Sequence, residues 1–422
     1  MSDKDLSVIV FGATGVTGRQ VAAYLAERAE EVGARWAVAG RDPAKLERVL
    51  GEVGVSAPET IIADVGDPAS LTAMAERTRV VLDLVGPYTL YGEPVIEACI
   101  AAGSHYVDLT GEIPFARRMI DAHHERAAEA GVKIVEVSGF EALPPDLAVL
   151  LAAETARDRW GEDLASADVD VDTLVPDGRT KLSSIVSGGT LQSGAETVAD
   201  AQAALSADSA ALIPDPETAE RVRRVSPIAV APRFNASGAV IGPMVPGAFI
   251  NPAVIHRTAM LAAEGEDRPF EPFRYREGVT IPGPPAALPL RYAAAAASAG
   301  FQVGFGALLR AKPQVRRRAA AWMRKLLPSS GFGPQGEALE GWSWQVAVNA
   351  ETTGGHFVRV SVDADGHPGY LSTARMLGEA GLLLAEEGAT PERGGCLTPA
   401  TALGTGCLDR FGRADVRFSV SS

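Results

Sequence analysis

Residues 7–18 read Ser-Val-Ile-Val-Phe-Gly-Ala-Thr-Gly-Val-Thr-Gly, and this stretch decides the fold. The apolar, β-branched run predicts a strand over Ser7–Phe11, and an amphipathic helix follows it. The three glycines between them match the demands of a strand–turn–helix unit that binds a dinucleotide. Gly12 turns the chain sharply, Gly15 lets the backbone approach a pyrophosphate, and Gly18 lets the helix pack closely on the sheet.

The free N–H groups at the start of this helix, at the positive end of its dipole, would hold the phosphates. The spacing is G-x-x-G-x-x-G rather than G-x-G-x-x-G, and the alternative is a glycine-rich turn without a ligand. Because the turn follows a strand, opens a helix and heads a series of such units, we expect a dinucleotide. The predicted phosphate-binding residues are Gly12, Ala13, Thr14, Gly15, Val16, Thr17 and Gly18.

The end of the second predicted strand favours NADP(H) over NAD(H). An NAD site usually has Asp or Glu there for the ribose hydroxyls, whereas this chain has Arg41, whose planar fork of donors suits a 2′-phosphate. Lys45, one helical turn later, would add a second positive charge. Asp64 follows the third strand, where it is expected to contact the adenine. The alternatives are a surface role for Arg41 and a helix N-cap role for Asp64.

The first 146 residues alternate strand and helix patterns, which predicts a doubly wound, Rossmann-type parallel sheet. The predicted strands are Ser7–Phe11, Arg35–Ala39, Thr60–Ala63, Val80–Val85, His105–Leu109 and Lys133–Val137.

Residues 147–370 predict a second, α+β domain with a mixed or antiparallel sheet, because the rhythm changes after Pro144-Pro145. Ala167–Leu174 alternates like a strand, and Ser193–Leu205 predicts a helix. Trp342–Ala350 and His356–Val362 predict an antiparallel hairpin. We expect residues 371–422 to pack back on the first domain.

The loop after the fourth strand predicts more of the cofactor site. Val85, Gly86, Pro87 and Tyr88 fall at the carboxyl end of a parallel strand, where ligands bind in open α/β sheets. Tyr88 and Tyr91 are the weak candidates for catalysis, since either hydroxyl could donate a proton. The alternative is a packed turn whose tyrosines bond locally. The catalytic Tyr-x-x-x-Lys pattern of short-chain dehydrogenases is absent here.

Composition excludes several other classes. A net charge of −14 argues against a nucleic-acid binder, and 46% apolar with 22% charged residues is typical of a folded globular chain. Three scattered cysteines favour a reducing, cytoplasmic compartment. His105, His123 and His124 lack any metal-ligand spacing, so no metal is expected. Oligomeric state is left open.

Residues 286–309 are apolar with Arg291 as the only charge, and a basic cluster follows them. This run is long enough to cross a bilayer, yet it is rich in Ala and Gly. We expect either a buried helical hairpin or peripheral membrane contact through 286–325. The basic cluster consists of Arg310, Lys312, Arg316, Arg317, Arg318, Arg324 and Lys325.

Further motifs occur in order along nearly the whole chain. They are Ala39-Gly40-Arg41, Gly86-Pro87-Tyr88-x-x-Tyr91-Gly92, Tyr106-x-Asp108-x-x-Gly111-Glu112, Gly139-Phe140-Glu141-Ala142-Leu143-Pro144-Pro145-Asp146, Ser187-Gly188-Gly189-Thr190, Pro368-Gly369-Tyr370, and Leu397-Thr398-Pro399-Ala400-Thr401-Ala402-Leu403-Gly404. With the glycine turn, this set resembles the saccharopine dehydrogenase-like oxidoreductases, and most closely their bacterial trans-acting enoyl reductase branch.

The resemblance implies an NADP-dependent reductase of lipid biosynthesis. Its substrates would be long acyl or polyketide chains supplied by a partner synthase that lacks its own enoyl reductase. Two departures concern the substrate: the family often has Asp-Ser where this chain has Glu141-Ala142, and Asp where it has His367. The resemblance transfers no catalytic residues. The other hypotheses are a non-catalytic nucleotide-bound protein of lipid surfaces and a reductase of a small carbonyl or imine.

Overall fold

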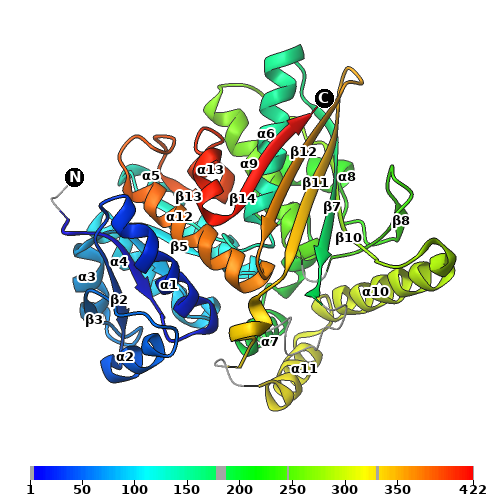
Figure 1. The fold of residues 1–422 in the computed structure, drawn as a ribbon. Coiled ribbons are helices and arrows are strands. Elements are labelled where there is room, and N and C mark those ends of the chain that lie inside the picture. The colour runs from blue at the N-terminus through cyan, green and yellow to red at the C-terminus, as the bar shows by residue number, and fades with distance from the viewer. Residues whose placement is uncertain (1–3, 177–186, 245–246, 329–331, 422) are drawn as a thin grey trace.

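The computed structural model describes residues 4–176, 187–244, 247–328 and 332–421. Two seven-stranded sheets form its framework (Figure 1). The first is wholly parallel, with the order β13-β6-β5-β4-β1-β2-β3, and the second is mixed, with the order β14-β12-β11-β7-β10-β9-β8. The predicted Rossmann-type fold with a second, mixed sheet is therefore confirmed.

The first sheet contains all six strands predicted from the sequence, each within about two residues of its expected ends. Its strands are β1 (Leu6–Phe11), β2 (Trp36–Gly40), β3 (Thr60–Ile62), β4 (Thr78–Asp83), β5 (His105–Asp108), β6 (Lys133–Val135) and β13 (Gly395–Leu397). The helices between them are α1 (Val16–Glu31), α2 (Pro43–Gly51), α3 (Pro68–Glu76), α4 (Tyr88–Ala102) and α5 (Ile113–Glu129). The central strands are short and mostly apolar because they are buried on both faces, whereas the edge strand β3 is partly exposed.

The second sheet contains β7 (Leu164–Leu174), β8 (Arg233–Phe234), β9 (Val240–Gly242), β10 (Arg274–Thr280), β11 (Ser343–Thr352), β12 (Phe357–Asp365) and β14 (Val416–Ser421). The predicted hairpin is confirmed as β11 and β12, with Val348 opposite Val360. Among the strand pairs of this sheet that the structure describes, only β7 and β10 run parallel.

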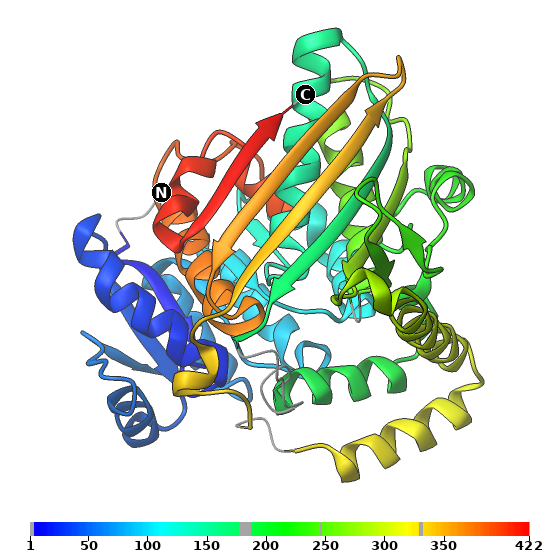
Figure 2. The ribbon, with the colours of Figure 1, turned by 45° about the vertical axis from the view of Figure 1, so that its right-hand side comes forward.

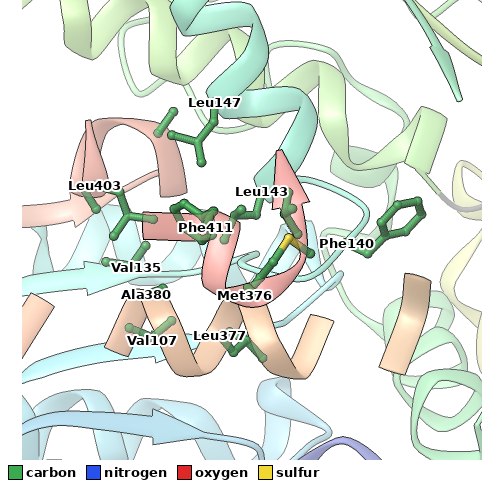
Figure 3. Close-up of a cluster of buried hydrophobic side chains, with 14 of the residues drawn as sticks. Val107, Val135, Phe140, Leu143, Leu147, Met376, Leu377, Ala380, Leu403 and Phe411 are labelled. Carbon is green, nitrogen blue, oxygen red and sulfur yellow. The ribbon is translucent and has the colours of Figure 1, made fainter. Parts of the chain in front are cut away.

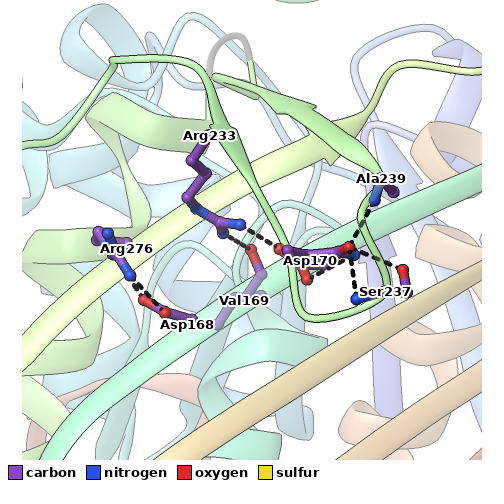
Figure 4. Close-up of polar contacts among 8 residues, drawn as sticks. Asp168, Val169, Asp170, Arg233, Ser237, Ala239 and Arg276 are labelled. Carbon is purple, nitrogen blue, oxygen red and sulfur yellow. Dashed lines mark hydrogen bonds and ion pairs between the residues drawn. The ribbon is translucent and has the colours of Figure 1, made fainter. Parts of the chain in front are cut away.

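One face of β7 carries acidic residues that are paired rather than free. Val169 and Val171 point into the core, whereas Asp168 and Asp170 point the other way. Arg276 holds Asp168 with two bonds of 2.6 and 2.7 Å, and Arg233 reaches Asp170 at 2.7 Å (Figure 4). These ion pairs tie β10 and the β8–β9 hairpin to β7.

The two sheets share one hydrophobic core through α6 (Leu143–Trp160) and α12 (Thr373–Ala385). Leu143 and Leu147 of α6 lie against Met376, Leu377 and the ring of Phe411 (Figure 3). The helix α12 also packs on α1 and β4, so its other side covers the first sheet.

The segment 371–422 contributes to both sheets. β13 pairs with β6, with Cys396 opposite Ile134, and β14 pairs with β12. Between them lie α13 (Pro399–Leu403) and a short 3-10 helix, η8 (Leu408–Ala414).

The part of the chain between β7 and β10 differs most from the secondary structure predicted from the sequence. The helix expected over Ser193–Leu205 is α7 (Gly188–Ala199), which begins earlier because Ser187 caps it and ends at the extended Asp200. η3 (Ala203–Ala207) follows it. The stretch from Ile213 to Pro289 is rich in Pro and Gly, yet it contains α8 (Pro216–Val225) and the 15-residue α9 (Asn251–Gly265).

The apolar run 286–309 forms one continuous helix, α10 (Leu288–Leu309), so the expectation of a buried hairpin within it is wrong. Its alanines favour an uninterrupted helix, and its glycines are too few to break it. The basic helix α11 (Pro313–Leu326) follows, and both helices project from the edge of the molecule (Figure 2).

Candidate functional site

Two of the three glycines in the first turn are required by the packing of the protein itself. Gly12 has a φ of 94°, and a Cβ there would lie 2.9 Å from the main-chain carbon and oxygen of Leu84. A Cβ on Gly18 would collide with the carbonyl oxygen of Gly12. Any side chain at either position would therefore push the turn away from the sheet.

Gly15 answers a different demand. Its φ of −73° suits any residue, and a Cβ there would meet its nearest neighbour, the Gly12 carbonyl oxygen, at an ordinary 3.5 Å. Gly15 is the N-cap of α1, and no side chain caps this helix. The open helix terminus and the missing side chain together fit a pyrophosphate that approaches the main chain of Gly15.

Arg41 lies at the carboxyl end of β2, exposed to solvent. Within the described part of the chain, no hydrogen bond or ion pair engages its guanidinium. Lys45 is exposed one turn into α2, where its N–H donates to the capping Asp42 carboxylate at 2.9 Å. Both side chains are available for a ribose phosphate.

Asp64 is not a helix N-cap, so that alternative is wrong. Asp67 caps α3, and its carboxylate accepts from the Ala69 N–H at 3.2 Å. The Asp64 carboxylate accepts from the Gly66 N–H at 2.8 Å and thereby shapes the loop after β3.

The loop after β4 continues the cofactor edge. Val85 is half-buried, Gly86 is exposed, and a cis peptide bond joins Gly86 to Pro87. The N–H of Val85 donates to the buried Asp83 carboxylate at 3.0 Å, which fixes where the loop leaves the strand.

The two candidate tyrosines occupy different environments. Tyr88 is buried, and its hydroxyl donates to the main-chain oxygen of Asp83 at 3.0 Å. Burial raises the pKa of Tyr88 well above its ordinary value. Tyr91 is 37% exposed on the first turn of α4. This geometry favours a packing role for Tyr88 and leaves the Tyr91 hydroxyl accessible.

Glu112 caps the N-terminus of α4. Its two carboxylate oxygens accept from the N–H groups of Tyr88 and Thr89 at 3.0 and 2.8 Å. A charged acceptor at a helix N-terminus stabilises the terminus, so Glu112 holds the β4 loop against the end of β5.

Two buried acids, Asp83 at the end of β4 and Asp108 at the end of β5, lie close together at the same edge of the sheet. The Tyr106 hydroxyl donates to Asp108 at 2.9 Å and lies 3.2 Å from Asp83. One O–H cannot serve two carboxylates, and burial raises the pKa of Asp108 to about 7 and that of Asp83 well above its ordinary value. One of the two acids therefore carries a proton at neutral pH.

A second acidic cluster, missed by the sequence analysis, lies beyond the end of β6. Glu141 is half-buried, and burial raises its pKa. Asn251 donates through its amide to the carbonyl oxygen of Glu141 and to the Glu277 carboxylate, the latter at 2.8 Å. The hydroxyl of Tyr275 donates to Glu277 at 2.6 Å, and burial raises the pKa of Glu277 to about 7. A carboxylate following a predicted parallel strand was the available signal for Glu141.

The second domain closes on the glycine turn. Val16, the first residue of α1, packs with Leu339 and Tyr370. Tyr370 faces Ser187 and Thr190 at the start of α7, and both its burial and the neighbouring Glu141 carboxyl raise its pKa. The first turn of α1, the start of α7 and Glu141 therefore all lie near Tyr370, beyond the carboxyl ends of the parallel strands.

The histidines near this edge have structural partners. His105 accepts from the Lys133 N–H at 3.0 Å, His124 accepts from the Cys396 N–H at 3.1 Å, and His123 lies 3.0 Å from Glu93. Among the residues described, no group of three potential ligands is placed to hold a metal.

Comparisons with known proteins agree with this geometry. Residues 8–135 match the family model of the saccharopine dehydrogenase NADP binding domain. A trans-acting enoyl reductase of Mycobacterium ulcerans is 33% identical, with 100% of this chain and 99% of the relative covered. One from Mycobacterium tuberculosis is 32% identical, with 98% and 97% covered. Saccharopine dehydrogenase (L-Glu forming) of Saccharomyces cerevisiae, at 14% identity, shares the fold with a TM-score of 0.50 over 98% of this chain and 99% of that one. The match to this domain shows NADP(H) binding, and the geometry of the open glycine turn fits such a site.

Proposed function

The chain belongs to the saccharopine dehydrogenase-like oxidoreductases, in their trans-acting enoyl reductase branch, and from this premise we propose that it reduces the enoyl double bond of a long-chain acyl thioester with NADPH.

A run of buried apolar contacts from the cofactor edge to α10 supports this proposal. A Cβ on Gly111, just past β5, would lie 3.0 Å from the side chain of Ile250. The next residue back, Phe249, packs on Gly306 of α10 and stacks with Phe305, their ring centroids 6.2 Å apart. An extended acyl chain suits apolar surroundings of this kind, whereas a small amino-acid-like substrate needs cations to bind its carboxylates.

The reaction adds a hydride to the β-carbon and a proton to the α-carbon. Bound NADPH supplies the hydride. The protein must stabilise the enolate and deliver the proton. We assign the proton to Glu141, because burial raises the pKa of its carboxyl, the residue is half-buried rather than enclosed, and the carboxyl lies near Tyr370. The carboxyl gives its proton to the α-carbon and regains one from water, so the balance closes.

Asn251 has a positioning role in this scheme. Its amide ties the main chain of Glu141 to Glu277, which Tyr275 holds in turn. Because Glu277 is fully enclosed, it fixes Asn251 rather than exchanging protons with substrate.

The Glu141→Gln variant tests the assignment. Loss of a general acid costs about 100- to 10,000-fold in kcat, while NADPH affinity and melting temperature are expected to stay unchanged. The loss of activity at rising pH that deprotonation of Glu141 causes, the basic limb of the pH–rate profile, should also disappear. Tyr91→Phe is the matched comparison, and a larger loss there would transfer the role to Tyr91.

The substrate class is tested by NADPH oxidation with α,β-unsaturated acyl thioesters of rising length. Each methylene that the protein removes from water is worth about 0.8 kcal/mol, or roughly fourfold in kcat/KM, so the rate should rise with chain length until further methylenes stay in water. A rate independent of length, with turnover of a small imine or keto acid instead, would contradict the proposal.

We also propose that a separate synthase supplies the acyl chain on a carrier domain, as the trans-acting relatives' names suggest for them. The same enoyl chain should then react with a lower KM on a carrier protein than on coenzyme A. Equal KM values would argue against a partner synthase.

A further inference from the structure

The helices α10 and α11 present an apolar surface that the rest of the chain does not cover. Pro285–Leu309 is long and apolar enough to cross a membrane, yet only 28% of its most apolar window is buried. The buried residues form one narrow stripe that contacts the protein: Ala295, Ala299, Gln302, Gly306 and Leu309. On the open sides, Leu290 is 74% and Phe301 is 64% exposed.

The helix α11 follows α10 and carries an exposed apolar stripe of its own. Val315, Trp322 and Leu326 recur at helical spacing on one side of α11, and Trp322 is 65% exposed. Trp and Leu on one face beside Lys and Arg are typical of helices that lie in a membrane interface.

The basic cluster divides into two groups. Three of its members serve the fold: Arg310 and Arg316 bind main-chain oxygens of the η3 region, and Arg324 pairs with Glu196 at 2.7 Å. The other four are exposed and, within the described ranges, meet no carboxylate: Lys312, Arg317, Arg318 and Lys325. These four cations form a local positive patch beside an apolar face, although the chain as a whole has a net charge of −14.

We infer that the surface formed by α10 and α11 docks on an anionic lipid bilayer, with the two helices lying along the membrane rather than through it. The stripe from Ala295 to Leu309 holds α10 on the protein along most of its length, so spanning would require unpacking it. The acidic remainder of the chain would be repelled from such a surface, and the free cations of α11 offset this repulsion.

Two other occupants fit less well. A two-fold symmetric contact with a second copy would bring each set of free cations near its own equivalent, which is unfavourable. An acidic carrier protein would use the cations of α11, but it would leave the apolar length of α10 uncovered. Phe249 packs on Gly306 in the buried stripe of α10, on the side that faces the protein.

Sedimentation with phosphatidylcholine vesicles, with and without phosphatidylglycerol, tests the inference on the full-length protein. We expect binding only to the anionic vesicles, weakened by salt. Each cation near an anionic surface contributes about fivefold, so Arg317→Glu with Arg318→Glu should weaken binding at least about tenfold. Arg359→Glu with Arg413→Glu, two exposed arginines elsewhere that make the same charge change, should leave binding intact.

The apolar contribution has its own variant. Trp322→Ser with Leu326→Ser should weaken sedimentation with the anionic vesicles, whereas Phe357→Ser, at an equally exposed site on β12, should not. These side chains are exposed, so the fold should survive the changes. Absence of binding to anionic vesicles, together with a dimer that Trp322→Ser dissociates, would overturn the inference in favour of a second copy. Capture of acyl carrier protein without vesicle binding would overturn it in favour of a carrier.

Discussion

Replacing Arg41 with alanine should separate the two nicotinamide cofactors. Arg41 is exposed at the end of β2, and in the described residues its guanidinium has no protein partner. Its removal should therefore leave the free energy of unfolding within about 0.5 kcal/mol of the wild-type value. The only lost interaction is the one with the 2′-phosphate of the cofactor.

The size of the loss follows from the chemistry of that contact. A hydrogen bond to a charged group is worth about 1.5–3 kcal/mol, which is roughly a 10- to 150-fold weaker Kd for NADPH. NADH lacks the phosphate, so its Kd should change less than about twofold. Arg41→Asp should widen the difference, because a carboxylate would repel the phosphate.

Titration of cofactor fluorescence at two salt concentrations measures both affinities. The NADPH preference of the wild type should narrow as salt rises, since the Debye length falls from about 10 Å at 0.1 M to about 3 Å at 1 M. Arg48→Ala is the matched control, because Arg48 is exposed on the next turn of α2 and already pairs with Glu52 at 3.0 Å. Equal losses of NADPH and NADH affinity in Arg41→Ala would refute the assignment.

Three further predictions concern the turn and its supports. Gly18→Ala should lower the free energy of unfolding by about 1–3 kcal/mol through overpacking. Gly15→Ala should keep the melting temperature of the wild type but weaken NADPH binding. An equal loss of stability in both variants would contradict the distinction between a packing role for Gly18 and a cofactor role for Gly15. Tyr88→Phe should cost about 1 kcal/mol of stability for one buried hydrogen bond and leave kcat within a few-fold, so a hundredfold fall in kcat would restore Tyr88 as a proton donor. The folded chain keeps the Asp108 proton up to about pH 7 while the unfolded chain loses it near pH 4, so this group makes stability fall as pH rises between these values. Asp108→Asn should flatten that part of the urea-unfolding profile, and an unchanged slope would count against a raised pKa at Asp108.

The nucleotide domain could be predicted because its signals are local. A strand, a glycine turn and a helix follow one another directly between Leu6 and Glu31, and the same unit repeats, so the period of the apolar residues suffices to predict the domain. Arg41 was predictable for the same reason, since its role depends on one position after one strand.

The residues that lie opposite the glycine turn could not be predicted in this way. Tyr370 reaches Val16 only through the second sheet and η7 (Pro368–Ser372), far apart in the chain. Asn251 begins α9 in a stretch whose prolines and glycines mask the helical period. Glu141 was visible in the sequence, but burial and its neighbours, which determine its pKa, come from long-range packing.

Reduction of one long-chain enoyl thioester by NADPH in D₂O, followed by mass spectrometry of the product, tests the central claim most directly. The account predicts a saturated acyl thioester that carries one solvent deuterium at the α-carbon, with one NADPH consumed per product. Recovery of the unchanged enoyl chain while NADPH binds, or a product reduced at the carbonyl with its double bond intact, would contradict it.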